Sequence, residues 1–103
     1  MKELIGSFLD YLSVERGLAK NTIIAYREDL NIYLDFIIKR GIDALSKISK
    51  NDITEFMLLE KNKGISPTSI SRRLAAIRMF HRFLARERVL KSDPTTLIDS
   101  PKL

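Results

Sequence analysis

Hydrophobic residues recur at helical spacing along almost the whole chain. The first stripe predicts a helix over about residues 2–16, ended by Gly17. A longer stripe predicts a second helix from about residue 21 to residue 40, ended by Gly41. The members of the two stripes are Leu4, Ile5, Phe8, Leu9 and Leu12, and then Ile23, Ile24, Leu30, Tyr33, Leu34, Ile37 and Ile38.

A third helix is predicted to follow Ser49 and to stop at Gly64. Ser49 with Asp52 three residues later resembles a capping box in which Asp replaces the usual Glu. The predicted core residues of this helix are Ile53, Phe56, Met57 and Leu59. We expect its polar end, Glu60-Lys61-Asn62-Lys63, to lie in solvent.

Ser66-Pro67 predicts the start of a fourth helix, with Ser as the N-cap and Pro at the first helical position. The helix should run to about Val89, and Asp93-Pro94 should cap a short C-terminal helical turn. Its apolar face carries Ile70, Leu74, Ile77, Phe80, His81 and Leu84, where His81 is best explained as a packed side chain. The pattern as a whole predicts an all-α domain of four helices.

Length and composition narrow the function. The 103 residues suffice for one domain, no apolar run is long enough for a membrane span, and the beginning of the chain does not resemble a secretory signal. There is no Cys and only one His, which argues against thiol catalysis, metal sites and His-based catalytic dyads. We therefore expect a domain without cofactor or metal that is not catalytic by itself.

The net charge of +5 comes from one stretch of the chain. Residues 1–65 hold ten basic and ten acidic side chains, whereas residues 66–91 hold seven basic side chains against Glu87 alone. A helical wheel places Arg78, Arg82 and Arg86 with Thr68 and Ser71 on one exposed face of the fourth helix, and Arg72 and Arg73 beside it. An arginine-rich face suits phosphate contacts, although a solvated basic face is an equally simple explanation.

The start of the second helix offers a matching polar group. Lys20, Asn21, Thr22 and Arg27 lie within its first two turns and could contact phosphates or base edges. Alternatively, Asn21 only caps the helix. Ala19 just before it cannot supply a side-chain cap.

Short motifs in a fixed order resemble the N-terminal domain of Xer-type tyrosine recombinases of the phage integrase family. The resemblance covers essentially the whole chain, and its specificity lies in the ordered set of motifs. They include Phe8-Leu9-Asp10-Tyr11-Leu12, Glu15-Arg16-Gly17-Leu18, Asn21-Thr22, Ala25-Tyr26-Arg27, Asp29-Leu30, Ser69-Ile70-Ser71-Arg72-Arg73-Leu74, Phe80-His81-Arg82-Phe83-Leu84 and Asp93-Pro94.

The resemblance implies a SAM-like core-binding domain, an orthogonal four-helix bundle whose second and fourth helices face the major groove of a DNA half-site. Residues 1–98 would form this domain, and residues 99–103 would begin a linker to a C-terminal catalytic domain that lies outside the 103 residues. None of Tyr11, Tyr26 and Tyr33 matches the family's nucleophile. Site residues implied for DNA are Lys20, Asn21, Thr22, Arg27, Thr68, Ser69, Arg72, Arg73, Arg78 and Arg82, with Thr68, Ser69 and Arg72 as base contacts.

The resemblance also implies partners and a location. We expect a double-stranded half-site, other recombinase protomers in a synaptic tetramer, a cytoplasmic protein, no membrane and no cofactor. The isolated domain should be monomeric and should cleave nothing. The alternative hypothesis is a helical protein-interaction module that uses its basic face to bind an acidic partner.

Overall fold

Four α-helices make up the domain. The computed structural model describes residues 1–98, with α1 (Glu3–Val14), α2 (Lys20–Lys39), α3 (Lys50–Asn62), α4 (Pro67–Arg86) and a short 3-10 helix, η1 (Leu45–Lys47), before α3. No β-strand occurs within residues 1–98, so the all-α prediction is confirmed. The linker predicted for residues 99–103 lies outside the described residues. None of the described helices is long and apolar enough to cross a membrane.

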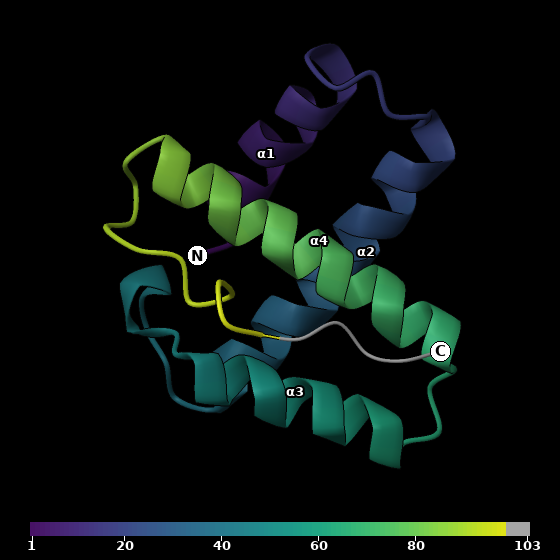
Figure 1. The fold of residues 1–103 in the computed structure, drawn as a ribbon, viewed down its shortest axis with the longest axis vertical. Coiled ribbons are helices and arrows are strands. Elements are labelled where there is room, and N and C mark those ends of the chain that lie inside the picture. Colours follow the sequence, from purple (N-terminus) through teal and green to yellow (C-terminus); the bar gives the residue numbers. More distant parts are fainter. Residues whose placement is uncertain (99–103) are drawn as a thin grey trace.

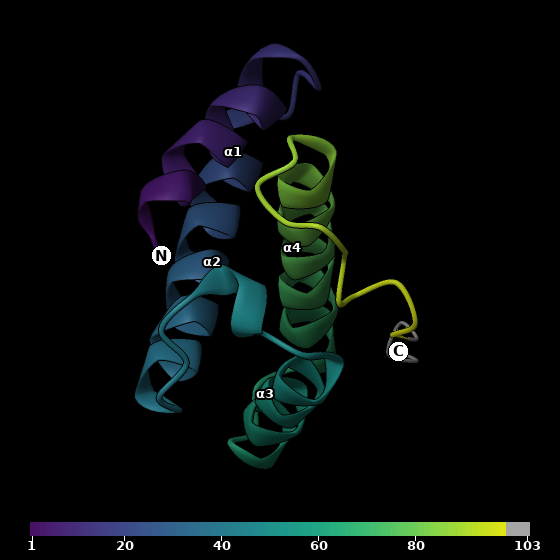
Figure 2. The same cartoon turned by 90° about the vertical axis from the view of Figure 1, so that its left-hand side faces the viewer.

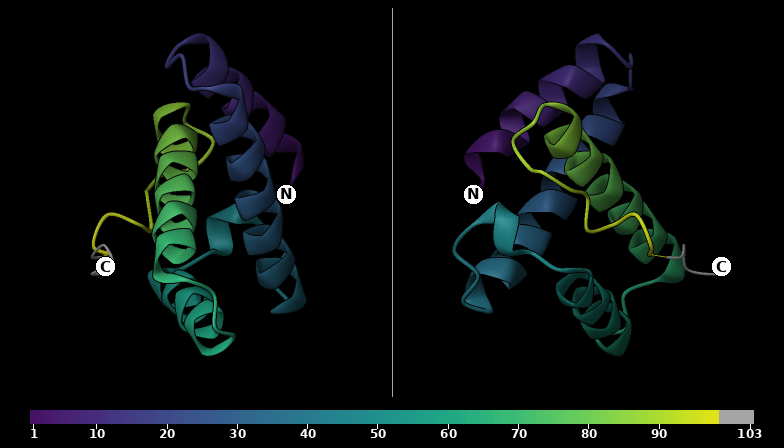
Figure 3. Two further views of the ribbon diagram at one scale, coloured as in Figure 1. Left: turned by 90° about the vertical axis from the view of Figure 1, so that its right-hand side faces the viewer. Right: turned by 60° about the vertical axis from the view of Figure 1, so that its left-hand side comes forward.

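Helix α4 is the centre of the arrangement. It crosses α2, on which it packs most extensively, and α1 lies on the same side of it as α2 (Figure 1). Helix α3 lies across one end of the bundle, below α4 (Figures 2 and 3). After α4 the chain turns back along the side of α4 that faces away from α2. The predicted cap at Asp93 is present, since its carboxylate accepts from the Thr95 N–H at 2.8 Å, and residues 94–97 after it form a hydrogen-bonded turn.

The predicted starts of α3 and α4 are confirmed. The Ser49 hydroxyl accepts from the Asp52 N–H while the Asp52 carboxylate accepts from the Ser49 N–H, which completes the capping box. Asp52 also accepts from Arg40 Nε at 2.8 Å, which joins the end of α2 to the start of α3. The Ser66 hydroxyl caps α4 by accepting from the Ser69 N–H.

Left-handed residues end the helices. Gly41 and Gly64 follow α2 and α3 with φ of 87° and 82°, a conformation that glycine adopts without a steric penalty. Helix α4 ends at Arg86, earlier than the predicted Val89, because Arg88 adopts a φ of 61° and breaks the helical ladder there. The turn lets Leu90 fold back and become buried.

The core lies between the facing sides of the four helices. Phe8, Tyr33, Phe56 and Phe80 are at most 2% exposed, and the Phe8 and Phe80 rings meet edge to face with centroids 5.5 Å apart. Most members of the predicted stripes are buried or half-buried. The prediction is wrong for three of them: Ile24 and Ile38 are about half exposed, and Leu59 is 38% exposed.

The buried face of α3 is rotated from the predicted one. Ile53, Phe56 and Glu60 share it at spacings of three and four residues, so the expectation that Glu60 lies in solvent is wrong. The predicted packing of His81 is confirmed: the ring is fully buried, and its Nε2 atom hydrogen-bonds the Tyr33 hydroxyl at 2.8 Å.

Candidate nucleic-acid interface

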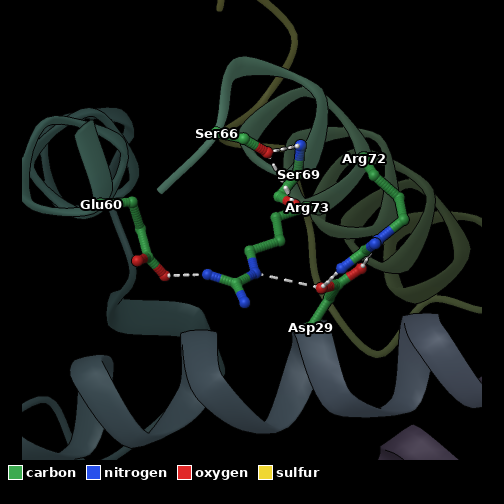
Figure 4. Close-up of polar contacts among 6 residues, drawn as sticks. All are labelled: Asp29, Glu60, Ser66, Ser69, Arg72 and Arg73. Carbon is green, nitrogen blue, oxygen red and sulfur yellow. Dashed lines mark hydrogen bonds and ion pairs between the residues drawn. The ribbon is translucent and has the colours of Figure 1, made fainter. Parts of the chain in front are cut away.

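A buried carboxylate organises the arginines near the start of α4. Asp29 of α2 is 0% exposed and accepts hydrogen bonds from both Arg72 and Arg73 (Figure 4). Arg72 binds it through Nε and Nη2, each at 2.8 Å, which is a bidentate pair. Arg73 reaches it through Nε at 3.1 Å and reaches Glu60 of α3 through Nη1 at 2.7 Å. These four side chains, which we call the Asp29 network, join α2, α3 and α4.

The two arginines of the Asp29 network differ in their access to solvent. The Arg73 side chain is 12% exposed and lies between two carboxylates, so its contacts are those of a bundle-stabilising residue. The Arg72 side chain is 42% exposed and has one carboxylate partner. Hydrogen bonding to the Asp29 carboxylate raises the pKa of the Arg72 guanidinium above its ordinary value. Of the two, only Arg72 has both a fixed position and a large accessible surface.

The hydroxyl residues at the start of α4 are arranged around its N-cap. Thr68 is exposed, whereas Ser69 is half-buried and its hydroxyl accepts from the Ser66 hydroxyl at 3.1 Å (Figure 4). The Ser66 and Ser69 hydroxyls are therefore used for capping. Thr68 is the one of the two predicted hydroxyl contacts that presents an exposed side chain.

The basic face predicted for the rest of α4 is partly covered. Arg78 is half-buried and donates from Nη2 to the carbonyl oxygen of Ile98, in the segment that returns along α4. Arg82 and Arg86 are exposed, as predicted. Arg86 donates to the Tyr11 hydroxyl at 2.7 Å, and its guanidinium lies 4.2 Å from the Tyr11 ring centroid. The hydrogen bond from Arg86 is the main cause of the lowered pKa of Tyr11.

The polar group at the start of α2 lies mostly in solvent. Lys20, Asn21 and Arg27 are exposed, and Thr22 is half-buried. The alternative prediction that Asn21 caps the helix is wrong, because the N-cap residue is Ala19. As expected for alanine, Ala19 contributes no side-chain hydrogen bond. Lys20 and Asn21 thus lie in the first turn of α2, which has no side-chain cap.

Sequence reasoning missed the acidic partners of the basic helix. Asp29 lies among the apolar positions of α2, between Tyr26 and Tyr33, and Glu60 continues the face of Ile53 and Phe56. An acid on an apolar helix face is the signal that could have identified them, because such a residue is buried only with a cationic partner. Within residues 1–98, no group of three or more His, Cys, Asp or Glu residues is placed to hold a metal ion.

The sequence itself matches a known family over most of its length. A family model described as "Phage integrase, N-terminal SAM-like domain" matches residues 5–88, and the chain belongs to this family of helical recombinase domains. Among its relatives, the tyrosine recombinase XerC of Herpetosiphon aurantiacus is 41% identical over 103 residues, which are all of this chain and 34% of that protein. The tyrosine recombinase XerD of Oceanobacillus iheyensis is 40% identical over 99 residues, covering 95% of this chain and 33% of that protein.

The tyrosine recombinase XerD of Staphylococcus aureus strain Mu50 is 39% identical over 102 residues, covering 99% of this chain and 35% of that protein. The chain thus spans about a third of the length of the curated relatives that it matches. The predicted resemblance to Xer-type recombinases is confirmed.

Proposed function

We propose that this domain binds double-stranded DNA as part of a site-specific tyrosine recombinase and helps to clamp one recombination half-site during strand exchange. The family match over residues 5–88 is the observation that carries the proposal. Its partners would be the half-site and further recombinase protomers in a synaptic tetramer. Strand cleavage would require residues beyond these 103, so we expect the chain alone to bind DNA and to cleave nothing.

The distribution of charge supports this proposal. Asp29 and Glu60 compensate two of the seven basic side chains of residues 66–91, and Glu87 compensates a third. The exposed basic side chains that remain lie in the second half of α4 and the loop after it: Arg82, Arg86, Arg88 and Lys91. Exposed cations of this kind bind phosphates without reading sequence. We assign phosphate contacts to Arg82 from α4 and to Lys20 and Arg27 from α2.

The proposal changes the roles of two predicted site residues, since the Ser69 hydroxyl accepts from the N-cap Ser66 and Arg73 is enclosed by carboxylates. Arg73 is held between Asp29 and Glu60 with little accessible surface, so we assign it to the stability of the bundle rather than to DNA. Thr68 and Arg72 remain candidates for base contacts.

Removing the Arg82 guanidinium should weaken DNA binding in a salt-dependent way. For Arg82→Ala we expect the slope of log affinity against log salt to become shallower by about 0.9, since one phosphate contact is lost. The measurement is fluorescence anisotropy of a labelled duplex of random sequence between about 50 and 200 mM salt.

Lys47→Ala is the matched control, because Lys47 is an exposed cation on η1 that already pairs with Asp43 at 2.8 Å. It should leave the slope unchanged. A wild-type affinity that does not respond to salt would contradict DNA binding. Tight binding to an acidic peptide without binding to the duplex would instead support the protein-interaction alternative.

A further inference from the structure

We propose that Arg72 reads a guanine base in the major groove and that Asp29 is the positioning residue that aims it. This inference rests on the proposed function, because it concerns how the same surface discriminates between DNA sequences. The pairing of a wholly buried carboxylate with a partly exposed arginine carries it.

The hydrogen bonds of Arg72 leave a defined part of its guanidinium available. The group has five N–H donors, and Asp29 takes two of them, one on Nε and one on Nη2. Asp29 is the one hydrogen-bond partner that residues 1–98 give to Arg72. The end of the guanidinium therefore keeps one N–H on Nη2 and both on Nη1. A parallel pair of these matches the O6 and N7 acceptors of guanine.

The burial of the two partners determines which way this free end faces. Asp29 is 0% exposed, whereas the Arg72 side chain is 42% exposed. The edge bonded to Asp29 must therefore face the interior, and the accessible surface belongs to the rest of the side chain. Figure 4 shows Arg72 reaching from α4 to Asp29 on α2. The carboxylate thus fixes a long, flexible side chain before any DNA is bound, which reduces the ordering required on binding.

Local charge favours a base over a phosphate as the ligand of Arg72. The two arginines and two carboxylates of the Asp29 network carry no net charge, so the network attracts a polyanion weakly. The free N–H donors of Arg72 still have a fixed orientation. They can form two parallel hydrogen bonds with a pair of uncharged acceptors at the correct spacing. Half-buried Ser71 and Ala75 flank its turn of α4, and these small side chains allow a base edge to approach.

The test measures sequence preference and salt dependence separately. The 103-residue chain selects from a pool of duplexes with a randomised central window, and its affinity is then measured for the selected duplex and for duplexes with each guanine replaced. For the wild type we expect a preference for guanine at one position of about 5- to 150-fold. Arg72→Ala and Arg72→Lys should lose this preference and keep the wild-type salt slope, since lysine cannot form the two-pronged contact.

Two carboxylate variants separate positioning from stability. Asp29→Asn removes the charge that holds Arg72 and should reduce the guanine preference at least several-fold. Glu60→Gln is the matched control: it weakens the same network through Arg73, which leaves Arg72 in place, and should retain the preference. Circular dichroism verifies that each variant is folded, and if Asp29→Asn does not fold, the Arg72 variants still decide whether Arg72 reads a base.

Three results would overturn the inference. The first is a guanine preference that survives Arg72→Ala. The second is an equal loss of affinity for every sequence with a shallower salt slope, which would make Arg72 a phosphate contact. The third is a preference that Arg72→Ala abolishes and a folded Asp29→Asn variant retains, which would remove the positioning role of Asp29. If the wild-type chain binds no duplex at all, it is the proposed function that fails.

Discussion

Replacing Asp29 with alanine should destabilise the domain by about 3 kcal/mol or more, because it leaves a buried arginine without half of its compensating charge. Asp29 is 0% exposed and accepts three hydrogen bonds from two guanidinium groups. Arg72 is exposed enough to turn toward water, but Arg73, whose side chain is 12% exposed, would keep only Glu60. The measurement is the free energy of unfolding in urea, followed by far-ultraviolet circular dichroism at pH 7.

Asp35→Ala is the matched control for this change. Asp35 lies on the same helix and forms an ion pair with Lys2 at 2.6 Å, but its side chain is 60% exposed. Ion pairs of this kind contribute little to stability because water solvates both partners. We expect a loss several-fold smaller than that of Asp29→Ala. Equal losses for the two variants would show that the Asp29 network does not hold the three helices together.

Local sequence signals were sufficient to predict the four helices. The Ser49–Asp52 capping box, the Ser66-Pro67 start and the glycines that follow α2 and α3 each depend on residues within about one turn. The exception is the end of α4, where Arg88 adopts the left-handed conformation that glycine adopts elsewhere in the domain. No glycine marks that turn in the sequence, and Leu90, two residues after Arg88, is buried in the core.

The candidate site was harder to predict, because its character depends on partners far apart in the sequence. The helical wheel correctly placed Arg82 and Arg86 on an exposed face of α4, but the wheel gives no information about other helices, one of which helps to bury Arg73. Arg72 and Asp29 are 43 positions apart, and Arg86 and Tyr11 are 75 apart. Which cations are compensated, and which remain for a polyanion, therefore follows from packing. The predicted charge of +6 for residues 66–91 overstates what is available to DNA by the two arginines of the Asp29 network.

Packing also gives partners from other segments to two further arginines of α4, Arg78 and Arg86. The segment after α4 returns along the side of that helix facing away from α2 (Figure 2). In this segment the Ile98 carbonyl accepts a hydrogen bond from Arg78. Tyr11 of α1 orients Arg86 through both its hydroxyl and its ring. Outside the Asp29 network, Arg82 is thus the exposed α4 arginine to which residues 1–98 give neither of these partners. This is why it, rather than Arg78 or Arg86, is the residue chosen to test phosphate binding.

Acidification should destabilise the domain through His81 before it affects most carboxylates. Burial lowers the pKa of His81 to about 4, against 6.5 for the unfolded chain. The folded state therefore binds fewer protons than the unfolded state between these values. The neutral His81 ring should make its full contribution to the free energy of unfolding above about pH 6.5. This contribution should fall by up to about 1.4 kcal/mol per pH unit toward pH 4, which amounts to about 3 kcal/mol in total.

The contacts of His81 give the physical reason for this preference for the neutral ring. Its Nε2 atom pairs with the Tyr33 hydroxyl at 2.8 Å, and residues 1–98 provide no hydrogen-bond partner for its Nδ1 atom. A protonated ring would be a buried cation, which burial disfavours. The negative charge of Asp93 acts in the opposite direction and raises the pKa of His81, but its effect is smaller than that of burial. The capping Asp52, whose pKa is lowered, behaves differently: it loses its contribution to stability only below its ordinary value of 3.8.

The pH dependence is best measured as a difference between wild type and His81→Gln. The amide of glutamine retains a partner for the Tyr33 hydroxyl and does not titrate, and contributions from carboxylates common to both proteins cancel. The variant should be less stable at pH 7 but should lose little further stability between pH 6.5 and 4.5, where the wild type loses about 2 kcal/mol or more. Parallel curves for the two proteins over this range would mean that His81 titrates normally in the folded domain.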